Sequence, residues 1–281
     1  MPFTRTPRRR WPWKLGLCLM LLWITAGTAA AQIAVRSALA HDHDVAPGAT
    51  VQGAVEIENL TDEPAQARLR LRDYGFSHQG TNSFEEPGTN RRSNAPWVEL
   101  PQSVLTLPPN QRETVAYTLR IPEQIDGSAP TGTYWSILLI EPIASTSPAS
   151  TLSGSEDDQD VGVRQRTRYG VQIAAHIRAN GAPKLNVLQT NLARRDSTAH
   201  LTLDVENAGS KMARPRVHLE VYTADGERAL RKSASRMRIY PGTSVRFRLP
   251  LSGLSSGQYE ALVLIDVEGQ QMTGFQHSLE L

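Results

Sequence analysis

Apolar and polar residues alternate with a two-residue period along much of the chain after its first thirty or so positions. Leu69 and Leu71 alternate with three arginines, and Leu201, Leu203 and Val205 alternate with polar residues. A period of two places the apolar side chains on one face of a β-strand, whereas a helix would repeat every three to four residues. No convincing amphipathic helix pattern accompanies these segments. The sequence therefore predicts an all-β protein.

Four strand-like segments recur in the same order in the two halves of the chain. The pairs are "VEIENLTD" with "LDVENAGS", "ARLRLRDY" with "RVHLEVYT", "LTLPPNQRETVAYTLRIP" with "MRIYPGTSVRFRLPL", and "PTGTYWSILLIE" with "SSGQYEALVLID". Ordered repetition of this kind indicates a duplicated structural unit, and the turn signals have the spacing of antiparallel sandwiches. We expect two tandem immunoglobulin-like antiparallel β-sandwich domains, at 33–179 and 183–281, joined at "RANGAPKL".

The N-terminus has the composition of a targeting segment. It carries Arg5, Arg8, Arg9, Arg10 and Lys14 without an acidic residue, then an apolar run and the small residues "AGTAAA". This order predicts a signal peptide at residues 1–31 and an exported protein, periplasmic or associated with the cell surface. The apolar run is too short for a membrane anchor, so no membrane span is expected in the mature chain.

Export changes the expected charge and redox chemistry of the protein. Without the five basic residues of the signal peptide, acidic residues outnumber basic ones in a chain with 30 Lys and Arg and 28 Asp and Glu. This balance gives no reason to expect binding to nucleic acid. The only cysteine, Cys18, lies in the apolar run, so the mature protein is expected to hold together through apolar burial without disulfides.

Motifs for catalysis or metal binding are weak. The segment "AHDHDV" gathers His41, Asp42, His43 and Asp44, but neighbours on an extended chain point in opposite directions, so at most two of them can converge. No G-x-S-x-G motif is present. We expect no enzyme activity, no cofactor and no metal site. Trp97 and Trp135 lie in apolar segments and are expected to be core residues of domain one. His176, His200 and His218 are expected to be surface or hydrogen-bonded histidines.

A long polar stretch separates two good strands of domain one. It runs from Ile143 to Gln165 and includes "STSPASTLSGSEDDQD", whereas the equivalent connection in domain two is short. Its composition, rich in Ser, Thr, Pro and acids, is typical of a mobile loop. The strand after it, Tyr169 to Ile177, alternates in a way that fits either a strand lent to a partner or a strand packed into its own domain.

Three stretches of domain one form a familiar pattern: "PGATVQGAVEIENLTDEPAQARLRLRDY", "APWVELPQSVLTLPPNQRETVAYTLRIPE" and "GTYWSILLIEP", followed by the long loop and an alternating strand. The pattern resembles the N-terminal domain of periplasmic pilus-assembly chaperones, and is also similar to the domain of WxL-interacting surface proteins. The resemblance implies a non-enzymatic chaperone that binds surface or fimbrial subunits by β-strand addition. The residues it implies as the partner-binding strand are Tyr169, Val171, Ile173, Ala175 and Ile177.

The sequence departs from the chaperone pattern at the carboxylate anchor. The family uses an arginine on the first strand and a lysine on the last; Arg36 is a possible counterpart of the first, but the lysine position falls near Ala174 or Ala175, and Arg178 is the nearest cation. Two alternatives therefore stay open beside the chaperone: a structural or adhesive component of a cell-surface assembly, and a carbohydrate-binding accessory protein. The sequence does not specify an oligomeric state.

Overall fold

The computed structural model describes residues 33–143, 167–177, 181–195, 198–267 and 271–281. The predicted signal peptide, the long loop beyond Ile143, and Arg178 lie outside these residues. Within them the regular structure consists of strands apart from one 3₁₀ turn, η1, at Ala95–Trp97, and no helix is long and apolar enough to cross a membrane. The prediction of an all-β protein is confirmed.

The N-terminal half forms a sandwich of two sheets. The first sheet has the order β1-β3-β8-β6, and the second has the order β2-β10-β9-β4-β5, with β7 also pairing to β4. The strands are β1 (Ile33–Val35), β2 (Ala40–Val45), β3 (Thr50–Asn59), β4 (Ala65–Phe76), β5 (Asn82–Glu85), β6 (Val98–Glu99), β7 (Val104–Leu107), β8 (Arg112–Arg120), β9 (Gly132–Ile143) and β10 (Tyr169–Ile177).

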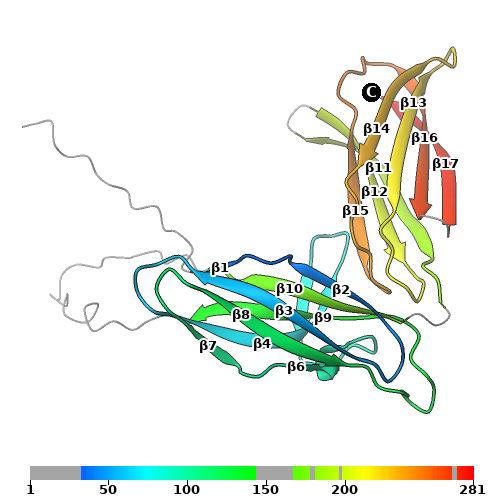
Figure 1. The fold of residues 1–281 in the computed structure, drawn as a ribbon. Coiled ribbons are helices and arrows are strands. Elements are labelled where there is room, and N and C mark those ends of the chain that lie inside the picture. The colour runs from blue at the N-terminus through cyan, green and yellow to red at the C-terminus, as the bar shows by residue number, and fades with distance from the viewer. Residues whose placement is uncertain (1–32, 144–166, 178–180, 196–197, 268–270) are drawn as a thin grey trace, which may run out of the picture.

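The C-terminal half forms a second sandwich of seven strands. Its sheets have the orders β11-β12-β15 and β14-β13-β16-β17. The strands are β11 (Leu185–Arg195), β12 (Thr198–Asn207), β13 (Arg216–Thr223), β14 (Arg228–Ala234), β15 (Ser244–Pro250), β16 (Gln258–Val267) and β17 (Gln271–Glu280). The two sandwiches stand at a steep angle and meet near one end of each (Figure 1). The fold is thus two tandem immunoglobulin-like sandwiches, as the repeated segments predict.

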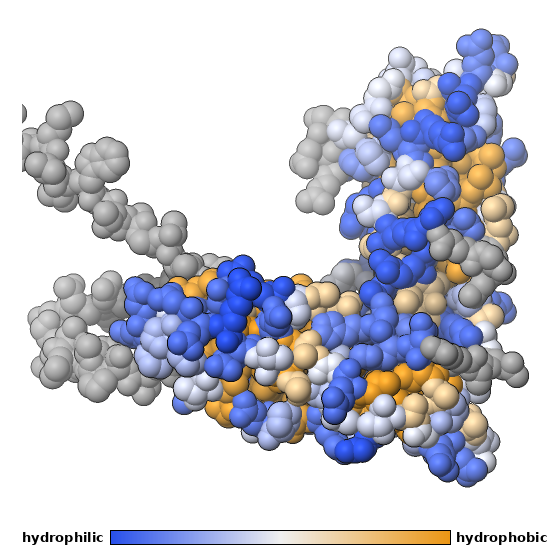
Figure 2. Space-filling view, in the orientation of Figure 1, coloured by the Kyte–Doolittle hydropathy of each residue, from blue (hydrophilic) through white to orange (hydrophobic). Residues whose placement is uncertain are grey.

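Each sandwich encloses its own apolar core, built from the inward side chains of alternating strands. In domain one Val55 and Ile57 of β3 are fully buried while Glu56 between them is exposed, and in domain two Leu201, Leu203 and Val205 of β12 are fully buried. The solvent side is mostly polar, and Figure 2 shows separate apolar patches on each domain of the visible face. The exact limits of the predicted domains, 33–179 and 183–281, stay predictions.

One buried asparagine has the same structural role in both domains. Asn59, at the end of β3, donates its side-chain N–H groups to the carbonyls of Glu63, Leu107 and Pro108. Asn207, at the end of β12, donates to the carbonyls of Lys211 and Ile239. Both side chains are fully buried. These asparagines end the matched segments "VEIEN" and "LDVEN", so the repeat seen in the sequence reflects a repeated corner of the fold.

Candidate functional site: the β10 edge and the domain junction

The N-terminal chain changes sheets directly beside β10. Strand β1 pairs with β3 in the first sheet, and the chain then crosses so that β2 joins the second sheet and runs parallel to β10. The pairing of β2 with β10 covers Gln172–Ile177 only, whereas β9 pairs with β10 along Tyr169–Ile177. Among the described residues, no strand therefore pairs with the start of β10 on the side away from β9.

Backbone geometry shows which groups this arrangement leaves at the edge. The N–H of Gln172 donates to the Leu39 carbonyl at 2.9 Å, so Gln172 directs its backbone groups toward β2. Successive residues of a strand direct their backbone groups to opposite sides. The N–H and C=O of Gly170, two residues earlier, therefore point past the beginning of β2. Leu39, at the boundary, is 51% exposed. The open edge is defined here as Thr167–Val171.

The side chains that the resemblance assigns to partner binding are mostly inside domain one. Val171, Ile173, Ala175 and Ile177 are at most 1% exposed and belong to the domain-one core, against which Tyr169 also packs. Of the two possibilities that the sequence left open for this strand, the structure therefore shows the apolar face packed into its own domain. What β10 can offer to a partner without unfolding is therefore its backbone at the open edge, not this apolar face.

The side chains of Arg168 and Ile137 lie beside the open edge. The Arg168 guanidinium lies 2.8 Å from the Glu141 carboxylate of β9, and Arg168 is more than half exposed. Gly170 lies under Ile137, because a Cβ at position 170 would come within 2.6 Å of the Ile137 Cδ1. A partner strand beside Gly170 would thus meet a flat backbone flanked by a basic side chain.

The possible carboxylate anchors are occupied or outside the described residues. Arg36, which follows β1, forms an ion pair with Glu58, and that pairing lowers the pKa of Glu58. Ala174 and Ala175 are fully buried. Arg178 lies outside the described residues. Arg36 and the alanine positions therefore offer no free cation for a terminal carboxylate.

The opposite face of β10 packs against domain two. Trp135 of β9 stacks on Tyr240 with ring centroids 4.7 Å apart and an interplanar angle of 7°, and Ala174 completes this buried cluster. The Tyr240 hydroxyl donates to the Gln172 Oε1 at 2.9 Å; burial raises the pKa of Tyr240 to about 12. The prediction that Trp135 lies in the domain-one core is wrong, because alternation along β9 turns it to the outer face of the sheet, where domain two covers it.

A polar network holds β2 to domain two. The Arg238 guanidinium binds both carboxylate oxygens of Asp42, with Nη2 2.7 Å from Oδ2, and the His176 Nε2 lies 3.1 Å from Asp42 Oδ1. The His176 hydrogen bond, followed by the contacts with Arg238, holds the pKa of Asp42 well below its usual range despite partial burial. Domain two thus anchors the edge strand that covers most of β10.

Backbone contacts make the junction tight as well as polar. The Thr133 N–H donates to the Ser210 carbonyl at 2.9 Å, and the Met212 N–H donates to the Thr133 hydroxyl at 3.0 Å. Gly132, with a φ of +83°, is required here because a Cβ would come within 2.0 Å of the Ser210 carbonyl oxygen. These contacts fix the beginning of β9 against domain two.

A line of aromatic rings runs from the surface into the junction. Phe84 is 43% exposed and stacks on Tyr74 at 5.5 Å; Tyr74 contacts Phe76 at 5.4 Å, and Phe76 contacts Tyr240 at 6.2 Å. A hollow of about 340 Å³ lies beside these rings and reaches Gln172 and Arg238. The junction therefore presents aromatic surface close to β10.

The histidines of β2 point into the sandwich edge, away from Asp42. His41 Nδ1 and His43 Nε2 lie 2.9 and 2.8 Å from the Tyr117 hydroxyl oxygen. Burial, followed by the nearby His41, lowers the pKa of His43. This division agrees with the expectation that at most two side chains of "HDHD" converge. Across the described residues, no group of three or more His, Cys, Asp or Glu is placed to hold a metal ion.

The remaining sequence expectations concern histidines and Trp97. His176, His200 and His218 each have hydrogen-bond partners, as predicted. Trp97 packs against the domain-one core and lies 4.7 Å from the Tyr134 ring, and both rings also line an open hollow of about 680 Å³. Trp97 is thus partly buried, not fully enclosed.

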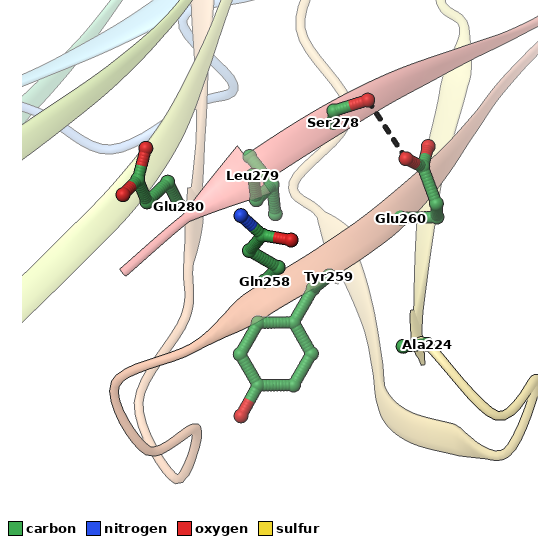
Figure 3. A pocket seen from close by; sticks show the side chains of 7 residues that line it. All are labelled: Ala224, Gln258, Tyr259, Glu260, Ser278, Leu279 and Glu280. Carbon is green, nitrogen blue, oxygen red and sulfur yellow. Dashed lines mark hydrogen bonds between the residues drawn. The ribbon is translucent and has the colours of Figure 1, made fainter.

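A separate hollow of about 390 Å³ lies in domain two, where β16 begins and β17 ends. In Figure 3 the Glu260 carboxylate accepts a hydrogen bond from Ser278, whereas Glu280 points away from it. The carboxylates of Glu260 and Glu280 therefore do not converge on one point in the hollow. This hollow therefore has no arrangement suited to acid–base catalysis.

No family model and no curated protein match this sequence. Solved structures similar to the chain include the class 5 fimbriae chaperone CfaA, with 12% identity and a TM-score of 0.43 over 89% of this chain and 100% of that one. The chaperone DraB of E. coli has 12% identity and a TM-score of 0.40 over 90% and 100%. The CsuC–CsuE chaperone–subunit complex of Acinetobacter baumannii has 11% identity and a TM-score of 0.40 over 77% and 90%.

Proposed function

We propose that this chain is an exported, non-enzymatic, chaperone-like protein that holds a surface or fimbrial subunit by β-strand addition at the open edge of β10. The observation that carries the proposal is the incomplete pairing of β10: β2 covers Gln172–Ile177 and leaves the start of the strand bare on that side. Bare strand edges invite pairing with another chain, so a protein that retains one gains from having a partner for it.

The setting of this edge supports capture of a short extended segment. The rest of β10 is held on both sides by β2 and β9, so the bare residues need little reordering to pair. The added segment would continue the line of β2 and would stop at Leu39, where the chain crosses between sheets. Pairing over Thr167–Val171 limits the contact to a few residues, which suits a reversible complex.

The mode of holding differs from the family that the sequence resembles. Arg36 is engaged by Glu58 and Arg238 by Asp42, so the proposal relies on backbone pairing and not on a clamp for a terminal carboxylate. Affinity would then come from main-chain hydrogen bonds and from side chains that the partner packs beside Arg168 and Leu39.

The test removes the edge donor without removing the strand. Proline at position 170 deletes the N–H that faces the open side, whereas Gly170→Ala adds the same Cβ against Ile137 but keeps the N–H. Subunits would be captured from envelope extract with the tagged mature protein, identified by mass, and bound again in purified form. We expect Gly170→Pro to bind the subunit about five- to tenfold more weakly, as for the loss of one or two hydrogen bonds, and Gly170→Ala to bind normally.

A second pair of variants separates binding from folding. Arg168 precedes the residues of β10 that pair with β9, so Arg168→Pro alters the open edge with less risk to the sheet, and Arg168→Ala is its control. Thermal unfolding of all four variants shows whether domain one is intact. Equal capture by the proline and alanine variants would overturn strand addition at this edge and favour a structural or adhesive role.

A further inference from the structure

Most strand edges of domain two carry features that discourage pairing with another chain. Bulges, Lys or Arg side chains and proline are the usual devices. Strand β11 has a bulge between Val187 and Gln189. Strand β15 carries Arg246 and Arg248 and ends at Pro250. The outer strands of the smaller sheet are thus both protected.

The larger sheet has one protected edge and one unprotected edge. Strand β14 carries Arg228, Arg231 and Lys232. Strand β17, at the other end of the sheet, is ten residues long and has no Lys, Arg or Pro in its sequence "QMTGFQHSLE". Among the described strands it pairs only with β16, and Figure 1 shows it at the outside of domain two. Its Met272 side chain is 71% exposed.

The sequence of this edge suits pairing with itself. Two β17 strands can pair antiparallel about a two-fold axis that passes beside Gln276. Gln276 then faces Gln276 of the other copy, and each residue before Gln276 faces the residue equally far after Gln276 in the other copy. Phe275 then faces His277, Gly274 faces Ser278, and Met272 faces Glu280. The carboxylate faces an apolar side chain, so no like charges lie directly opposite. This register pairs nine residues from each copy.

We propose that β17 is a homodimer interface, through which two copies pair edge to edge and join their larger sheets into one eight-stranded sheet. A two-fold contact of this kind is self-complementary and closes on itself, so it yields a dimer and not a fibre. The dimer places the two β10 edges on separate domains outside the interface. The inference is independent of the function proposed for β10, and Gly170→Pro is expected to leave the dimer unchanged.

The first test is sedimentation of the mature protein over a wide concentration range. The wild type should show a monomer–dimer equilibrium. Gln276→Lys places two ammonium groups opposite each other on the axis and should raise the dimer dissociation constant about fivefold. The control is Gln52→Lys, which adds the same charge at an exposed position of β3, an interior strand. A protein monomeric at every concentration, or equal effects of the two variants, would overturn the proposal.

The second test reads the register through a disulfide. In the mature protein, which lacks Cys18, a Gln276→Cys chain should form a disulfide-linked dimer under mild oxidation, because residue 276 faces its own copy. Residue 272 is also exposed, with Met272 71% exposed, but it faces residue 280 of the other copy, so Met272→Cys should cross-link much less. Cross-linking of Met272→Cys at an equal or higher rate would contradict the register and the interface.

Discussion

The two domains share a plan but use their last strands differently. In domain one, β10 has a neighbour on each side over most of its length, because the chain leaves the first sheet after β1 and its next strand, β2, pairs with β10. In domain two, β17 is the outermost strand and pairs only with β16 among the described strands. The same alternating pattern thus serves as an interior strand in one domain and as an edge in the other. What differs is the path of the N-terminal segment, since domain two has no described counterpart of β2.

The largest difference expected between the last strands concerns stability. Ile173 of β10 is fully buried, whereas Phe275 of β17 is only partly buried. Ile173→Ala should lower the free energy of unfolding of domain one by about 2–5 kcal/mol, and Phe275→Ala should cost domain two less. Denaturant unfolding, with hydrogen exchange to assign each domain, measures both. If Ile173→Ala kept full stability but abolished subunit capture, the apolar face of β10 would be lent outward after all.

The shared asparagine corners test how far the domains are alike. Asn59→Ala and Asn207→Ala each leave buried carbonyls without their donor, so each should destabilise its own domain by about 1–3 kcal/mol. Hydrogen exchange should show the loss confined to the domain that carries the change. Asn82→Ala is the control, because Asn82 is exposed and its side-chain oxygen accepts a hydrogen bond from the Tyr74 hydroxyl. An equal loss of unfolding free energy in Asn82→Ala would show that Asn59 and Asn207 have no special role in stability.

The smallest effect is expected at the contact between the two domains. Folding lowers the pKa of Asp42, so its ionised form stabilises the junction above about pH 4, where an unfolded aspartate is ionised, and this contribution declines as the pH falls further. Asp42 is about a third exposed, so the ion pair contributes about 1 kcal/mol or less. Small-angle scattering should show a narrow range of angles between the two domains at neutral pH and a wider range in acid.

Arg238→Gln is the matched variant for the pH experiment. It removes the charge opposite Asp42 but keeps a hydrogen-bonding side chain. The angle between the two domains should therefore already vary more at neutral pH than in the wild type, and acidification should change the scattering of this variant less. An identical acid response in Arg238→Gln and the wild type would show that other carboxylates control the junction.

The sequence by itself determined which face of each strand is apolar. The period of two follows from the backbone of a strand, so Leu69, Val205 and Ile173 could be assigned to buried faces without knowledge of their neighbours. The repeat also located Asn59 and Asn207 at equivalent turns. For the candidate site, the sequence singled out β10, which the structure shows to be only partly covered by β2, although alternation alone did not separate a lent face from a core face.

Only the tertiary structure decided which strands lie beside one another. Pairing joins residues far apart in the chain, such as Gln172 with Ala40, and no local pattern specifies it. The open edge at Gly170 exists because β2 begins two residues too late to cover it. Likewise the sequence predicts Trp135 to be a core residue of domain one. In the structure it lies between the two domains, because the outer face of its sheet packs against Tyr240. Burial follows from the local period, whereas exposure of backbone and contact between domains follow from how distant segments meet.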